Sequence, residues 1–282
     1  MRGEPIMNTN KLKSFASLVL VITSISALAN TQTLNAPKSL SELINKDRFG
    51  LAASSYNSTI GTTDNIDGVS QLNIVNLYYT ISDKDSLRWQ NQVTGTFQKD
   101  VDTNFTHAKT ILKYTRSGIL NQEEHGLNMS AAFEKRYITD PSARVDGNAY
   151  GHNRLSTSFS RKVNDKFSLG ATMFLALNDI RDSKVKTTTR NYFLGILSQS
   201  LSLPKNLSLT FFQEVFKANN SIDLDESASM TFNVDLSGSA TEKLGYNFTV
   251  YSTPLSGKDN LKYQDDFYEN LTYEFGLNYR AF

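Results

Sequence analysis

Charged side chains occur two residues apart in several extended stretches of this 282-residue chain. Glu134 and Arg136 are separated by one residue, and so are His152 and Arg154. In a β-strand, residues at this spacing point to the same face. A surface that gathers lysine and arginine attracts anions, and rings of these residues give pores an anion preference. The chemistry that the pattern predicts is therefore the binding or passage of small anions.

Pairing two neighbouring stretches would bring these charges together. A register that pairs Tyr137 with Gly151 places Glu134 opposite Arg154, where opposite charges stabilise a sheet. On the preceding stretch, Lys109 and Lys113 alternate with apolar residues, and we expect Lys109 to lie beside Glu134. The predicted inward-facing residues of this sector are Arg88, Lys109, Lys113, Glu134, Arg136, His152 and Arg154. The acidic candidates on the far side are Glu214, Asp235 and Glu274.

The sequence offers little for catalysis. The histidines His107, His125 and His152 have no metal-ligand spacing, and the absence of cysteine excludes thiolate zinc motifs and a cysteine nucleophile. His152 and Ser156 share a strand face, but four residues separate them by about 13 Å, beyond the reach of a nucleophile and its base. We therefore expect no enzyme activity, no metal and no cofactor.

The elements that carry these residues read as β-strands. From Arg48 onward, about twelve segments alternate between apolar and polar residues, as half-buried strands do. The clearest are Leu87–Phe97, Leu127–Phe133, Phe167–Leu177, Leu207–Val215, Met230–Leu236 and Leu244–Val250. The weaker ones are Phe49–Tyr56, Val69–Ile81, Phe105–Arg116, Tyr150–Val163 and Tyr192–Leu203. Because the segment at Phe49 is the least secure, a count of ten remains the alternative.

The connections between these segments alternate between short and long. Ser82–Asp85 and Pro204–Asn206 are short, whereas Thr139–Asn148 and Pro254–Asp266 are long. Membrane barrels have tight turns at one end and longer loops at the other, and a soluble sandwich has no reason to keep this order. The connection over Gly118–His125 is longer than the rule allows.

The composition fits a barrel that is apolar only on its outside. Hydrophobic residues make up 39% of the chain, and the mean hydropathy of −0.37 is too polar for a bundle of membrane helices. The net charge of +1 gives no reason to expect nucleic acid as a partner.

The first thirty residues have the parts of a secretory signal peptide. A basic region precedes an apolar run that ends at Ala27-Leu28-Ala29, so we expect residues 1–29 to be removed after Ala29. Residues 30–47 would follow as a periplasmic segment, with a short amphipathic helix around Leu40. That helix would serve as a lead-in to the first strand or, alternatively, as a plug in a pore.

The final stretch, Phe267–Phe282, alternates cleanly and ends on an aromatic residue. It resembles the last strand of Gram-negative outer-membrane β-barrels, where such a strand serves as the assembly signal. The resemblance implies an assembly role for Tyr279 and Phe282, with the barrel-assembly machinery, outer-membrane lipid and lipopolysaccharide as partners. Here the alternation runs one step out of phase with Phe282, which we interpret as a bulge or a frayed strand end.

These observations predict an all-β fold, one transmembrane antiparallel up-and-down β-barrel of about twelve strands over residues 48–282. The expected function is a narrow porin-like channel for passive diffusion of small hydrophilic solutes, with a preference for anions. A non-conducting barrel with a structural, adhesive or receptor role is the alternative, in which the inward charges form an ion-pair network that fills the lumen. An outer-membrane hydrolase ranks below both.

Overall fold

The structure is a computed structural model that describes residues 48–61, 66–98, 104–182, 189–219, 228–257, 261–264 and 270–281. The predicted signal peptide with Ala27 and Ala29, the segment 30–47 and the terminal Phe282 lie outside these residues. No helix within the described ranges combines the length and the hydropathy needed to cross a membrane.

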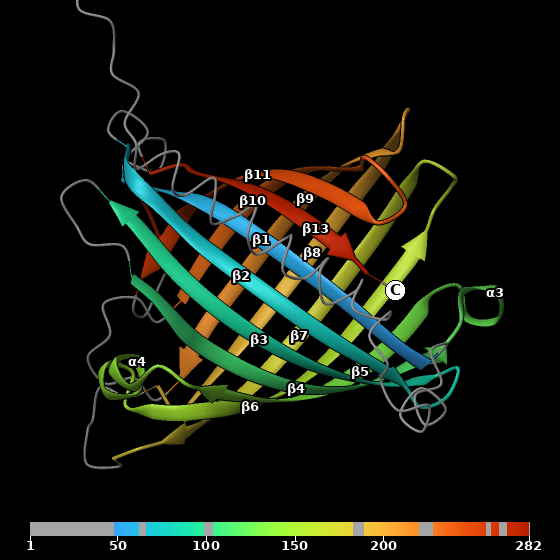
Figure 1. The fold of residues 1–282 in the computed structure, drawn as a ribbon. Coiled ribbons are helices and arrows are strands. Elements are labelled where there is room, and N and C mark those ends of the chain that lie inside the picture. The colour runs from blue at the N-terminus through green and yellow to red at the C-terminus, as the bar shows by residue number, and fades with distance from the viewer. Residues whose placement is uncertain are drawn as a thin grey trace, which may run out of the picture. The chain divides into compact units, whose positions relative to one another are not determined.

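Strands dominate the described chain (Figure 1). They are β1 (Phe49–Gly61), β2 (Ile66–Thr80), β3 (Asp85–Gln98), β4 (Asn104–Leu120), β5 (Asn128–Ile138), β6 (Ala149–Lys162), β7 (Phe167–Ile180), β8 (Asn191–Leu203), β9 (Leu207–Asn219), β10 (Ala228–Ser239), β11 (Leu244–Gly257), β12 (Lys262–Tyr263) and β13 (Thr272–Arg280). The two short helices are α3 (Gln122–His125) and α4 (Pro141–Asp146).

Twelve of the strands form a closed antiparallel ring. Each strand from β1 to β10 pairs with the next in sequence. Strand β11 pairs with β13, and β13 pairs with β1, which closes the ring. The two-residue β12 pairs only with the end of β11 and stands outside the ring. The prediction of a twelve-stranded up-and-down barrel is confirmed, and the segment at Phe49 is a strand of the ring.

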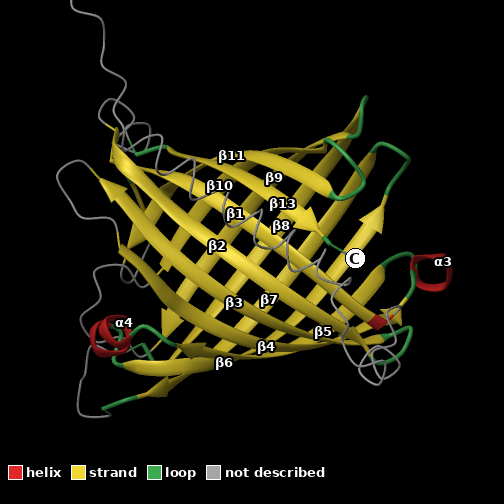
Figure 2. Ribbon diagram, in the orientation of Figure 1, coloured by secondary structure: helices red, strands yellow, loops and turns green. Residues whose placement is uncertain are grey.

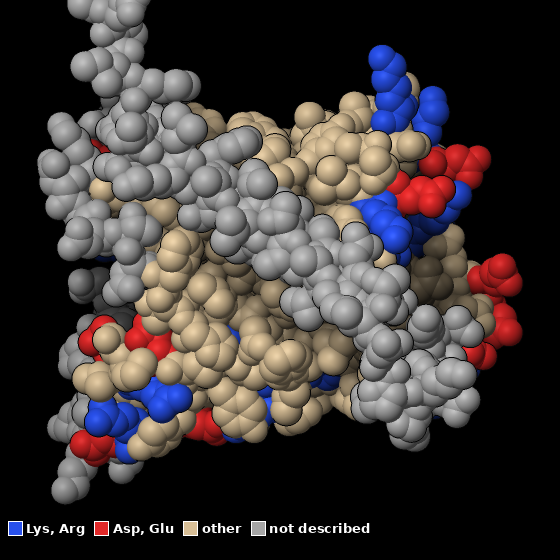
Figure 3. Space-filling view, viewed as in Figure 1, with Lys and Arg blue, Asp and Glu red and all other residues tan. Residues whose placement is uncertain are grey.

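The wall has an apolar outer face and a polar inner one. Leu155 and Leu175 lie opposite each other on β6 and β7 and are 59% and 50% exposed, although both are leucines. Ala176, the next residue of β7, points inward and is fully buried. Where the view of Figure 3 shows described residues of the wall, most of them are uncharged, and charged ones gather toward the ends of the strands. This inversion of the soluble pattern is what a lipid-facing barrel requires.

The two ends of the barrel differ. The helices α3 and α4 lie at opposite ends of the barrel (Figure 2). Strand order places tight turns such as Ser82–Asp85 at the α3 end and most of the longer connections at the α4 end. The connection predicted over Gly118–His125 is shorter in the structure, because β4 continues to Leu120. The helix α3 fills most of the rest, and Asn121 caps it by accepting a bond from the Glu124 amide. We refer to the two as the turn end and the loop end.

Neither ladder of β13 contains a register shift, and the strand ends at Arg280. Of the two interpretations of the phase mismatch, the described residues therefore support an early strand end rather than a bulge. Tyr279 is paired with Ala53 on β1 and with Leu244 on β11, so the last strand is integrated on both sides.

Candidate functional site

The strand register assembles a cluster of charges on the inner wall of β3 to β6. Tyr137 pairs with Gly151, so Glu134 lies opposite Arg154, as predicted. Lys113 lies opposite Glu134 from the other side, on β4. We call the group of Arg88, Lys113, Glu134, Arg136 and Arg154 the Glu134 cluster.

The expectation that Lys109 lies beside Glu134 is wrong. Lys109 pairs with Ile138, and it is Lys113 that pairs with Glu134. The four-residue difference places Lys109 about 13 Å further along the strand, toward the loop end. The register of β4 and β5 depends on how their connection is built, and α3 together with the irregular pairing between Arg116 and Leu120 sets it.

Glu134 is the centre of the cluster and is completely buried. Its Oε2 atom lies 2.8 Å from an Nη2 atom of both Arg136 and Arg154. Its Oε1 atom lies 3.2 Å from Nζ of Lys113 and 3.9 Å from Nη2 of Arg88. Four cations thus surround one carboxylate, and the cluster carries a net charge of three positive units.

Burial and solvent access divide the cluster into two parts. A buried carboxylate is costly unless ion pairs and hydrogen bonds compensate it. Arg136 donates a hydrogen bond from Nε to Oε2 over 2.8 Å, whereas Oε1 has ion pairs with Lys113 and Arg88 and no hydrogen bond. The side chains of the four cations remain between 12% and 26% exposed. Each guanidinium has five N–H donors, and one carboxylate cannot use them all. Guanidinium donors therefore remain that Glu134 does not use.

Aromatic rings extend the site around the barrel. The guanidinium of Arg154 lies 4.2 Å from the centre of the Phe174 ring, a distance typical of a cation–π contact. His152 accepts or donates a hydrogen bond of 3.1 Å with the Tyr192 hydroxyl, and the Tyr192 ring lies 5.5 Å from that of Phe216. Phe174, Tyr192 and Phe216 are not among the predicted site residues, because the prediction considered charged side chains and histidine only. Their signal in the sequence is alternation with Met173, Phe193 and Val215, which are exposed on the outer face.

The three predicted acidic residues lie on the inner face of the other half of the ring, on β9, β10 and β13. Each is held by a neutral donor. Asn233 donates to Glu214 over 2.9 Å, Thr249 to Asp235 over 2.7 Å and Ser58 to Glu274 over 2.9 Å. No ion pair within the described ranges involves them. The predicted cations thus line the inner face at β3 to β6, and the predicted carboxylates Glu214, Asp235 and Glu274 line it at β9, β10 and β13.

The histidines do not form a common site. His107 lies with Asn91 and Thr110 on the outer face, His125 closes α3, and His152 contacts Tyr192 rather than Ser156. The described residues contain no group of three or more histidine, aspartate or glutamate side chains with metal-binding geometry.

The comparisons with known proteins agree with the fold. No protein-family model and no curated protein matches the sequence. Among solved structures, the barrel is similar to the KdgM porin at a TM-score of 0.52 and 11% identity, over 81% of this chain and 98% of that one. The NanC porin gives 0.54 and 8% identity, over 81% and 98%. An outer membrane channel from Pseudomonas putida F1 gives 0.53 and 14%, over 82% and 95%. At these identities the likeness establishes the fold, that of outer-membrane channel barrels.

Proposed function

We propose that this protein is a channel of the Gram-negative outer membrane for passive diffusion of small hydrophilic solutes, with a preference for anions. The observation that carries the proposal is the Glu134 cluster, in which four cations surround a single buried carboxylate. A net positive wall inside a narrow barrel lowers the electrostatic cost of admitting an anion.

The similar structures support the choice of solute. The KdgM porin has also been determined in complex with disordered oligogalacturonate, which is a chain of sugar acids with one carboxylate in each residue. That complex belongs to the other protein, and at 11% identity it suggests a chemical class and no particular solute. The inner cations here are Arg88, Lys113, Arg136 and Arg154, with Lys109 further along the strand, and they fit the same class.

The orientation follows from the two ends of the barrel. Outer-membrane barrels have short turns in the periplasm and longer loops outside. We infer that the turn end faces the periplasm and the loop end, with α4, faces outward. Export would depend on residues 1–29 as a cleaved signal peptide, and insertion on recognition of β13 by the barrel-assembly machinery.

Recordings from the refolded full-length chain in a planar lipid bilayer test this function. We expect stepwise current increases, and in a salt gradient a zero-current potential whose sign corresponds to anion preference. The absence of any current step would remove the channel and leave a structural, adhesive or receptor barrel. A cation-selective current would contradict the role assigned to the Glu134 cluster.

A further inference from the structure

A cavity of about 850 Å³ lies at the loop end of the barrel and borders the Glu134 cluster, because its lining residue His152 pairs with Arg136. It is bounded by the ends of β4 to β8 and by the last residues of α4. Its volume is within the range of small-molecule sites, about 300–1,000 Å³. We call it the vestibule.

Hydrogen bonds fix the walls of the vestibule. The side chain of Asn148 donates to the Asp182 carbonyl over 2.7 Å and accepts from the Asp182 amide over 2.9 Å. Asn178 donates to the Thr189 carbonyl over 2.7 Å. The helix α4 is held by its cap at Asp140 and by Arg144, which donates to the Ile138 carbonyl over 2.6 Å. The cavity is therefore preformed, which lowers the entropic cost of binding.

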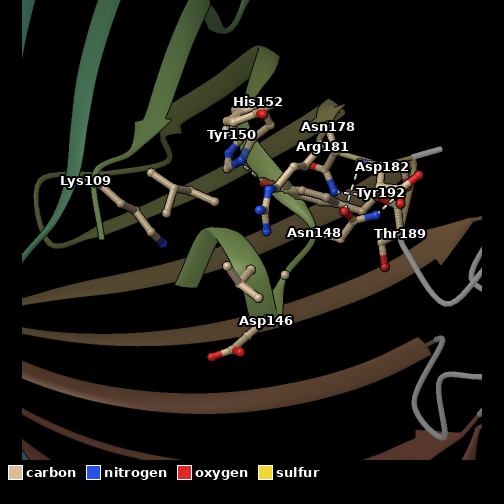
Figure 4. A pocket seen from close by; sticks show the side chains of 15 residues that line it. Lys109, Asp146, Asn148, Tyr150, His152, Asn178, Arg181, Asp182, Thr189 and Tyr192 are labelled. Carbon is tan, nitrogen blue, oxygen red and sulfur yellow. Dashed lines mark hydrogen bonds between the residues drawn. The ribbon is translucent and has the colours of Figure 1, made fainter. Parts of the chain in front are cut away.

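Two cations extend into this space. Figure 4 shows the side chains of Lys109 and Arg181 reaching toward each other from opposite sides. Within the described ranges, neither forms an ion pair. Asp146 and Asp182 also border the vestibule, but in Figure 4 both carboxylates lie apart from the amino group of Lys109. The two cations are thus free to receive an anionic group.

An aromatic pair forms another part of the lining. The rings of His152 and Tyr192 are 5.6 Å apart in an edge-on arrangement and are joined by their hydrogen bond of 3.1 Å. An aromatic ring presents an apolar surface with a polar edge. A pyranose ring has a complementary form, because its C–H groups make an apolar face and its hydroxyls project from the rim.

We propose that the vestibule is a binding site for a sugar acid, a pyranose that carries one carboxylate. Lys109 and Arg181 bind the carboxylate, and the ring packs against Tyr192 beside His152. A carboxylate alone would use only the two cations, and a neutral sugar only the aromatic side. The inference deepens the proposed function, because the ligand belongs to the class of solute that the channel would admit.

Isothermal titration of the refolded full-length chain in detergent tests the site with three probes. D-Glucuronate has both recognised parts, D-glucose lacks the carboxylate, and acetate lacks the ring. We expect saturable binding of glucuronate at least tenfold tighter than that of either other probe. Failure of glucuronate to bind, or equal binding of acetate or glucose, would overturn the proposal.

Substitutions locate the binding. Lys109→Gln and Arg181→Gln should each weaken glucuronate binding about tenfold, the loss expected for a charge-assisted hydrogen bond worth about 1.5 kcal/mol. Lys166→Gln, in a turn at the opposite end, is the matched control and should leave it unchanged. Tyr192→Leu should weaken glucuronate binding and leave acetate binding as it was. Glucuronate affinity that is insensitive to both cation substitutions would place the ligand elsewhere and refute the vestibule site.

The binding assay is independent of the channel. Glucuronate binding by a protein that passes no current would refute the channel and preserve the vestibule, as in a receptor barrel. Anion-selective current without glucuronate binding would preserve the channel and refute the vestibule.

Discussion

Oε2 of Glu134 lies 2.8 Å from Nη2 of Arg154, on the strand that directly faces it in the ladder. The Glu134 side chain has no exposed surface, whereas 12% of the Arg154 side chain is exposed. Glu134 thus acts as a buried structural anion, whereas part of Arg154 remains accessible from the lumen. Four predictions test the consequences of this arrangement and of the wall that holds it.

Neutralising the outer cations of the cluster should reduce anion preference. Arg88 and Lys113 are the most exposed of the four, at 26% and 24%, and we expect Arg88→Gln/Lys113→Gln to lower the net charge of the cluster from three to one. The zero-current potential in a salt gradient should move toward zero. Lys166→Gln, which removes a cation from an exposed turn, is the control. An unchanged potential would show that these groups do not line the conducting path.

Glu134→Gln should destabilise the folded barrel by about 3 kcal/mol, because removing one partner of a buried ion cluster leaves the others uncompensated. Here the four remaining cations would repel one another. Urea titration of the protein in lipid vesicles measures the change, with gel mobility of unheated samples as a second readout. Glu214→Gln is the matched control, since Glu214 has a neutral partner, Asn233, and should cost about 1 kcal/mol. Equal losses in both variants would show that the ion cluster adds no stability.

Gly151→Ala should disturb the junction of β5 and β6. A Cβ atom at this position would lie 1.9 Å from the carbonyl oxygen of Arg136, so the backbones must move apart. We expect a loss of about 1–3 kcal/mol, the range for overpacking, in the same urea titration. Gly195→Ala should cost less, because its Cβ would meet only the edge of the Phe193 ring at 3.3 Å. A neutral effect of Gly151→Ala would mean that the two strands separate more easily than their register implies.

A charge on the outer wall should be costly in proportion to its depth. Leu155 lies near the middle of the strand and is 59% exposed, so Leu155→Arg in lipid should cost about 2–4 kcal/mol. Leu201→Arg, close to the turn end of β8, should cost at most about 1 kcal/mol. The comparison is made in vesicles by urea titration. If the two variants were equally stable, the outer face would not be the lipid-facing one.

Much of this site followed from alternation alone. Because strand side chains have a period of two, the apolar positions Phe133 and Leu155 fix Glu134 and Arg154 on the opposite face. The sequence also predicted that Tyr137 pairs with Gly151 across the α4 connection, and the ladder of β5 and β6 confirms this register. The inner charges are thus encoded locally.

The misplacement of Lys109 has a different origin. Its partner depends on the irregular pairing near Gly118, where φ is +61°, and such irregularities leave no periodic signal. Arg181 was missed for a related reason. It follows β7 in a connection, and the bond from its amide to the Asn148 carbonyl, over 2.9 Å, together with the bonds between Asn148 and Asp182, brings it to the vestibule.

The seam between β1 and β13 constrains how the barrel can form. Ser58 and Glu274, 216 positions apart, join across it through a bond of 2.9 Å. Until that seam closes, two strand margins hold unpaired amides and carbonyls, which hydrocarbon cannot hydrate. Insertion and closure must therefore proceed together. A chain that lacked its final strand could not close the ring, and its unpaired backbone groups would make a partly inserted state unstable.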